Sequence, residues 1–225
     1  MNLNEAVIEK EINISPNDAL IVIDIQYDFI PGGALAVEEG DKIIEDINTI
    51  GLKFFNNQAK IILTQDWHPQ NHLSFASNHP GKSPGDEYQT EAIGPILWPD
   101  HCVQGTHGAK IHSDLNVNLA HAIIRKGYNP LIDSYSGFMD NDKKSETGLA
   151  GLLESLKVKR IFICGLALDY CVFFTAMDGI DFGFEVYLLP YQTKGIDIPE
   201  GNISHALEEM KQKGIKFVNM LSFKT

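Results

Sequence analysis

Cysteine is scarce in this sequence, which has three among its 225 residues: Cys102, Cys164 and Cys171. So small and odd a number excludes the disulfide framework that stabilises many small secreted domains. We therefore expect free thiols. Each of them has to be explained either as a packing group or as a chemical group.

Positive charge is also in short supply, because 18 lysines and arginines face 30 acidic residues and the formal net charge is -12. The lysines are scattered among acids and form no basic stripe that could neutralise phosphates. We therefore predict that nucleic acid is not a partner of this protein.

Long apolar runs are missing as well. No stretch approaches the roughly 20 residues that a helix needs to span a bilayer. The first 18 residues mix charge throughout and lack the apolar core of a signal peptide. The sequence thus predicts no membrane association and a cytoplasmic location.

The residues that are present fit an ordinary globular protein, with 44% hydrophobic and 21% charged residues. The length suits one domain, which we place at 1–225. Short β-branched runs alternate with helical periodicity, as βαβ crossovers require. We predict an α/β fold with three α/β/α layers around a mainly parallel sheet. The expected strands are 19–26, 59–66, 121–127, 160–167, 185–190 and 215–221, and the expected helices are 38–57, 147–158, 168–180 and 199–213.

Two boundaries and one loop carry further expectations. Pro199 suits the first turn of the last helix, and Gly214 suits the position just past its end. Residues 67–110 lose periodicity and gain Pro, Gly, Asn and His. A connection of that length usually carries function or is disordered.

Reactive side chains follow four of the expected strands at their carboxyl ends, where open α/β sheets bind ligands. They are Asp24, Asp28, Asp66, His68, Lys126 and Cys171. Any one of them could belong to an ion-pair cluster. A thiol, a lysine and a carboxylate at one edge are, however, the parts of an activated nucleophile.

Cys171 lies in the first turn of the helix after the fourth expected strand, where free N–H groups and the helix dipole favour a thiolate. Lys126 would lower the pKa of the thiol further, and Asp24 could accept its proton. Taken singly, Cys171 could be a small buried hydrophobe, Lys126 a solvated strand-end residue and Asp24 a turn residue.

Asp66 and His68 are two residues apart at a strand end, so their side chains project to the same face. With His101 or another loop histidine they supply one oxygen and two nitrogens, which leaves coordination positions open, as in a catalytic metal site. The alternative is that His68 only supports a His-Pro turn. The other histidines of this region are His72, His79, His107 and His112.

Several motifs, in this order, resemble those of the isochorismatase-like cysteine hydrolase superfamily, and within it the members that hydrolyse nicotinamide. The resemblance runs from Leu20 to about Leu221. The motifs are DIQYDFIPGGALAV, TQDWHPQNHLSFA, LWPDHCVQGTHGA, RKG, SYSGF and GLALDYCV. Leu168 departs from the pattern, because many relatives have Thr there.

The resemblance implies hydrolysis of nicotinamide to nicotinate and ammonia through a cysteine thioester, in NAD salvage. It implies a cis peptide bond before Ala167, and it places His72 near a position that some relatives use as a metal ligand. It assigns catalysis to Asp24, Lys126 and Cys171, the oxyanion hole to Ala167 and Cys171, the metal to Asp66, His68 and His101, and substrate binding to Phe29, Trp98 and Tyr135. Phe29 and Trp98 would sandwich the pyridine ring, although both could instead pack in the core.

The cofactor is expected to be one divalent metal ion, with zinc favoured over iron or manganese. A small molecule, nicotinamide, is the expected partner, and the oligomeric state is left open, a homo-oligomer included. One alternative is another small-amide or N-carbamoyl amidohydrolase, or an isochorismatase, of the same superfamily. Others are a mononuclear iron oxygenase, since two histidines and a carboxylate also form its triad, and a non-catalytic binding module with an inert Cys171.

Overall fold

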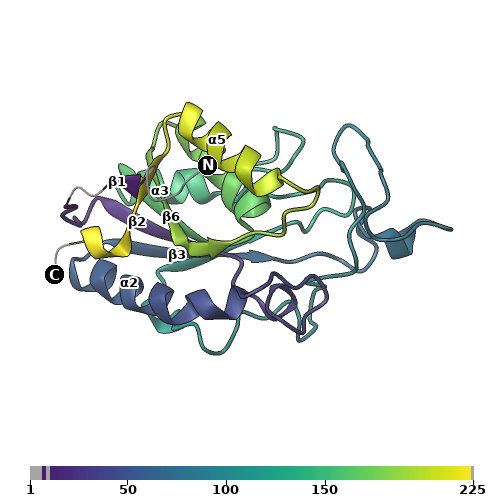
Figure 1. The fold of residues 1–225 in the computed structure, drawn as a ribbon, viewed down its shortest axis with the longest axis horizontal. Helices are drawn as coiled ribbons and strands as arrows, with labels where there is room; N and C mark the ends of the chain where they lie inside the picture. The colour runs from purple at the N-terminus through teal and green to yellow at the C-terminus, as the bar shows by residue number, and fades with distance from the viewer. Residues whose placement is uncertain (1–6, 9–10, 224–225) are drawn as a thin grey trace.

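A computed structural model of the chain describes residues 7–8 and 11–223. Its centre is a seven-stranded sheet in the order β1-β7-β6-β5-β2-β3-β4, in which every neighbouring pair is parallel (Figure 1). The strands are β1 (Val7–Ile8), β2 (Asp18–Ile23), β3 (Lys60–Asp66), β4 (Ala122–Lys126), β5 (Arg160–Leu166), β6 (Glu185–Lys194) and β7 (Lys216–Val218). The α-helices are α2 (Ile44–Asn56), α3 (Leu149–Ser155), α4 (Phe173–Asp181) and α5 (Asn202–Gln212).

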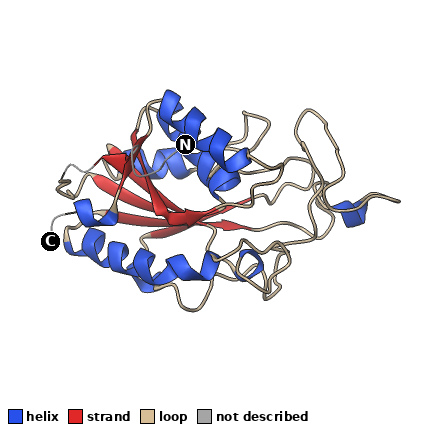
Figure 2. Cartoon of the chain, viewed as in Figure 1, coloured by secondary structure: helices blue, strands red, loops and turns tan. Residues whose placement is uncertain are grey.

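Helices cover both faces of the sheet, with α2 on one side and α3, α4 and α5 on the other (Figure 2). Strand β2 shows why. Its residues alternate between two cores, so that Leu20 and Val22 join the cluster around α2, while Ile21 and Ile23 join the cluster around α3 to α5. A strand buried on both faces reads as a continuous apolar run. The predicted three-layer fold with a parallel sheet is confirmed.

Some boundaries differ from the prediction. The helix expected over 38–57 begins with a 3-10 turn, Gly40–Ile43, before α2. The prediction that Pro199 opens the last helix was wrong, because α5 begins at Asn202. Gly201 has a φ of 89°, outside the helical region, so the helix can start only after it. At the other end, Gly214 has a φ of 95° and follows the helix, as expected.

The long segment 67–110 folds back onto the carboxyl edge of the sheet. Short parallel bridges join His68 to Val103 and Phe75 to Trp98. The amide of Trp98 also donates to the carbonyl of Ser74 at 2.8 Å. The loop is therefore ordered around the strand ends, where it brings His101 and Trp98 over the sheet. In the part of the chain that the structure describes, no helix has the length and apolarity needed to cross a membrane.

Candidate active site

A lysine joins the groups at the carboxyl edge. Lys126, the last residue of β4, is fully buried. Its Nζ lies 3.1 Å from Asp24 Oδ2 and 3.4 Å from Cys171 Sγ, and it also contacts Asp66 Oδ1. It donates in addition to the carbonyl of Ser134 at 2.9 Å. The structure thus brings together the thiol, the ammonium and the carboxylate that the sequence indicates.

Asp24 follows β2 and adopts a φ of 48°, which turns the chain at the strand end. Its Oδ1 accepts a hydrogen bond from the Thr64 hydroxyl at 2.6 Å, and its backbone N–H donates to the Thr64 hydroxyl oxygen at 3.2 Å. One oxygen of the carboxylate is therefore fixed by β3. The other, Oδ2, faces Lys126 at 3.1 Å, and one oxygen of the carboxylate lies within 4.8 Å of the Cys171 sulfur.

The electrostatics of this cluster follow from its burial. Burial raises the pKa of Asp24, which the nearby Lys126 counteracts only in part. Burial would lower the pKa of Lys126, but Asp24 and Asp66 outweigh it, so the ammonium form persists. Lys126 thus serves as the ion-pair partner of both buried carboxylates, Asp24 and Asp66.

Cys171 lies in a π-helical turn, Leu168–Val172, just before α4, and only 6% of its surface is exposed. The sequence-based expectation of a lowered thiol pKa was wrong. Burial raises the pKa of Cys171 well above its ordinary value, and Lys126 offsets that rise only in part. The resting residue is a thiol, so a nucleophile forms only when a neighbour takes its proton.

A second cluster adjoins the first. The ligand-type atoms of Asp66, His68 and His101 all lie within 4.8 Å of one another. His68 Nδ1 is 2.8 Å from the carbonyl of Gly127, and His101 Nδ1 is 2.8 Å from the carbonyl of Pro99. A carbonyl can only accept, so each Nδ1 carries a proton, and in the neutral ring each Nε2 keeps the lone pair that a metal would bind. Such anchoring of the second ring nitrogen is typical of metal-binding histidines.

The charges also suit a cation. Burial and the neighbouring His68 lower the pKa of His101 to about 4, which keeps its ring neutral. Burial would lower the pKa of His68 too, but Asp66 outweighs it and the pKa is raised. Asp66 Oδ2 lies 3.5 Å from His68 Nε2 and thus favours a positive charge at this position. One oxygen and two nitrogens with room for further ligands fit a catalytic zinc site.

His72 lies beside this cluster but is occupied otherwise. Its Nε2 donates to the carbonyl of Ile132 at 3.1 Å, and its Nδ1 accepts from the Ser74 hydroxyl at 2.7 Å. Burial lowers its pKa to about 3, so the ring is neutral. With both nitrogens engaged by protein groups, His72 supports the loop and does not face the ligand cluster.

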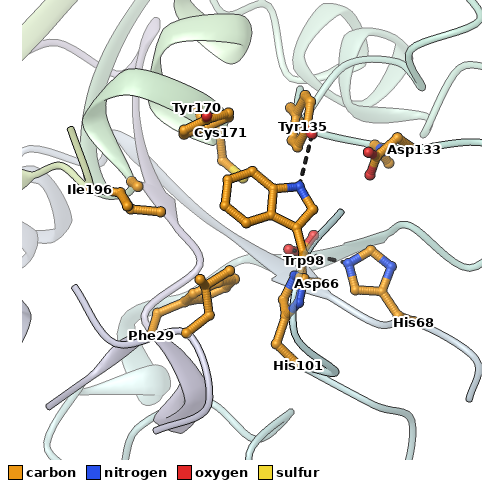
Figure 3. A pocket seen from close by; sticks show the side chains of 13 residues that line it. Phe29, Asp66, His68, Trp98, His101, Asp133, Tyr135, Tyr170, Cys171 and Ile196 are labelled. Atoms are coloured by element: carbon orange, nitrogen blue, oxygen red, sulfur yellow. Dashed lines mark hydrogen bonds and ion pairs between the residues drawn. The ribbon is translucent and has the colours of Figure 1, made fainter. Parts of the chain in front are cut away.

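Cys171 from the first cluster and the three residues of the second face one pocket (Figure 3). Phe29, Trp98 and Tyr135 line it together with the metal-type residues, Ala167 and Cys171. Trp98 Nε1 donates to the Tyr135 hydroxyl at 3.0 Å, which fixes the indole. The peptide bond between Leu166 and Ala167 is cis. Every residue that the resemblance assigns to substrate binding thus reaches the pocket.

Other lining residues were not predicted from the sequence. Asp133, Ser134, Tyr170 and Ile196 also line the pocket. Ser134 is the first residue of the SYSGF motif and Asp133 directly precedes it, so their place beside the predicted pocket residue Tyr135 was the one available signal. Asp28, which follows β2, instead holds the loop, because its Oδ2 accepts from the Cys102 amide at 2.7 Å.

Gln26, for which the sequence predicts no role, holds neighbouring segments of the chain together. Its side-chain amide donates to the carbonyl of Asp66 at 2.8 Å and its oxygen accepts from the Asp66 amide at 2.7 Å. It also donates to the carbonyl of Ala109 at 2.9 Å. Gln26 therefore locks the end of β3 to the chain beyond β2 and to the long loop.

Known proteins resemble this chain in both sequence and structure over nearly its full length. Residues 18–220 match the isochorismatase domain model. The chain is 44% identical to a nicotinamidase from Acinetobacter baylyi, over 95% of this chain and 97% of the relative. A nicotinamidase and pyrazinamidase from Acinetobacter baumanii has the same fold, with a TM-score of 0.87, 43% identity and coverage of 92% and 97%. The pyrazinamidase of Pyrococcus horikoshii in complex with zinc matches with a TM-score of 0.75, 45% identity and coverage of 91% and 99%.

Proposed function

Because this chain belongs to the isochorismatase family, we propose that it is a nicotinamidase, which hydrolyses nicotinamide to nicotinate and ammonia. The observation that carries the proposal is the contact of Lys126 with Cys171 and Asp24 at the floor of an aromatic pocket. The nicotinamidases to which the chain is similar support the choice of substrate. We also propose that the chain works as one domain; its cytoplasmic location and oligomeric state stay predictions.

Asp24 starts the reaction as a general base. It takes the proton of the Cys171 thiol, and the sulfur then adds to the amide carbon of a ring held between Phe29 and Trp98. Lys126 stabilises the negative sulfur as it forms, since its Nζ is 3.4 Å away. Burial raises the pKa of Asp24, which makes its carboxylate a stronger base toward the thiol proton and keeps that proton on Asp24 until the leaving nitrogen accepts it.

The negative charge that develops on the amide oxygen needs donors. The backbone N–H groups of Ala167 and Cys171, two residues that line the pocket, are the proposed donors. Each is worth about 2.7–4 kcal/mol of barrier height. Asp24 protonates the departing ammonia, then deprotonates the water that hydrolyses the thioester, so that nicotinate leaves and the thiol is restored.

Asp66, His68 and His101 would hold a divalent metal, and zinc is the proposed ion because a similar pyrazinamidase is in complex with it. When bound, the metal would bind the ring nitrogen, orient the amide and withdraw electrons from it. The rival iron oxygenase has no use for the buried contact between Lys126 and Cys171. That contact favours the amidase.

Substrate choice tests the proposal directly. We expect ammonia release from nicotinamide to exceed that from simple N-carbamoyl compounds by at least about 100-fold in kcat/KM, because a flat ring is what Phe29 and Trp98 can stack against. A coupled assay for ammonia, run with both substrates at matched concentrations, measures the ratio. Faster release from the carbamoyl compounds would assign the chain to another amidohydrolase.

The metal site is tested through Gly127. A methyl group there would lie 2.4 Å from the His68 ring, and this glycine has a φ of 71°. We expect Gly127→Ala to weaken zinc binding by roughly 10-fold or more, because the ring must move from its carbonyl anchor. Gly105→Ala is the matched control, since Gly105 has a φ of 80° but open space around it. Equal zinc affinity in the two variants, measured by competition with a chelator, would argue against His68 as a ligand.

A further inference from the structure

Asp133 has an unusual position for an acid. It lies between β4 and the Tyr135 side of the pocket, is 2% exposed and lines the cavity beside His68 (Figure 3). Its Oδ1 accepts from the amide of Ser134 at 3.2 Å. Its Oδ2 has no hydrogen-bond partner among residues 7–8 and 11–223. Burying a carboxylate oxygen without a partner is costly, so a partner from outside the protein chain is expected.

The neighbouring Tyr135 hydroxyl has only one proton to give. It accepts from Trp98 at 3.0 Å and lies 3.3 Å from the carbonyl of Gly94, and that carbonyl and the Asp133 side chain compete for its proton. A second donor, located in the pocket, would give Oδ2 a partner of its own.

The charges around the pocket point to the nature of that donor. Burial raises the pKa of Asp24 and raises that of Asp133 to about 6. In their ionised forms, Asp24, Asp66 and Asp133 contribute three buried negative charges, and Lys126 contributes one positive charge. With His68 and His101 as neutral ligands, the set is two charges short of neutrality. One divalent cation supplies that difference, whereas a neutral substrate supplies none of it.

Asp133 is not itself a member of the ligand cluster. The three residues whose ligand-type atoms converge are Asp66, His68 and His101. Three protein ligands leave at least one coordination position, which water fills in catalytic sites. A water bound to a divalent ion is an unusually strong donor, and a buried carboxylate is its natural acceptor.

We propose that Asp133 accepts a hydrogen bond from a metal-bound water and thereby strengthens metal binding as a positioning residue. The inference rests on the metal site proposed above and not on the identity of the substrate. Outer partners of this kind change metal affinity by about 10- to 100-fold. They leave the fold of the metal-free protein untouched.

Zinc binding to the metal-free protein tests the inference without any assay of activity. We expect Asp133→Asn to weaken zinc binding by about 10- to 100-fold in competition with a fluorescent chelator. We also expect the metal-free variant to unfold at the same temperature as the metal-free wild type, or at a higher one, because an unpartnered buried charge has been removed. A purely structural role for Asp133 would lower that temperature instead.

Asp140→Asn is the matched control, because Asp140 is a buried carboxylate of the following loop, 5% exposed, that does not line the pocket. It should bind zinc like the wild type. Asp133→Ser provides a second variant should Asp133→Asn fold poorly. Unchanged zinc affinity in the Asp133 variants would overturn the inference alone. Failure of the wild type to bind zinc, with Asp66→Asn behaving identically, would overturn the metal site as well.

Discussion

Alanine in place of Cys171 is expected to reduce kcat/KM for nicotinamide by about 10⁴-fold or more, because no other group can form the covalent intermediate. The fold should survive, since the sulfur lines a pocket and does not pack inside the sheet. Ammonia release gives the rate, and circular dichroism with a zinc titration shows that the fold and the metal site persist.

Cys164→Ala is the control for this experiment. Cys164 is an equally buried thiol on β5, but its side chain belongs to the core around α2. Its loss should cost some stability and leave the rate for nicotinamide near that of the wild type. If Cys171→Ala retained comparable activity, the nucleophile would have to be sought elsewhere.

Lys126→Met should produce the largest loss of stability, about 3–5 kcal/mol of unfolding free energy, because it leaves Asp24 and Asp66 buried without a cation. Urea denaturation in the presence of a chelator measures it, since a bound metal would mask part of the effect. Activity should fall with it, because the forming thiolate loses its only neighbouring ammonium among the described residues.

Lys143→Met is the control, because it removes an ion pair at the protein surface. Lys143 Nζ lies 2.9 Å from Asp178, but its side chain is 52% exposed. Such a pair contributes at most about 1 kcal/mol, since water and salt screen it. If both variants lost a similar free energy of unfolding, the buried cluster around Lys126 would contribute no more to stability than an exposed ion pair does.

The sequence was sufficient for the parts of the site that topology determines. Asp24, Lys126 and Cys171 each follow a strand, and parallel strands end at one edge, so their meeting was predictable. His101 was not predictable from spacing, because several histidines share its loop. It was chosen through family resemblance, and the structure shows that its Nδ1 is anchored while its Nε2 is left for a ligand.

Features that depend on burial could not be obtained from the sequence. The pKa of Cys171 rises because the pocket floor is sealed, whereas a helix N-terminus and a lysine alone would have lowered it. Likewise, Oδ2 of Asp133 accepts no hydrogen bond from the described residues, which depends on how the chain packs around it. The first residue of α5 was missed because Gly201 takes a left-handed conformation that no periodicity reveals.

The ammonium of Lys126 contacts groups that lie 60 and 45 residues away along the chain. Contacts between residues so far apart in the sequence can form only late in folding, after β4 has docked against β3 and β5 has paired with β2. Partly folded chains, even compact ones with most of their helices, thus have no means of turning over an amide. Catalytic activity therefore arises only once β2, β3, β4 and β5 are assembled, and a single activity measurement reports on all four strands.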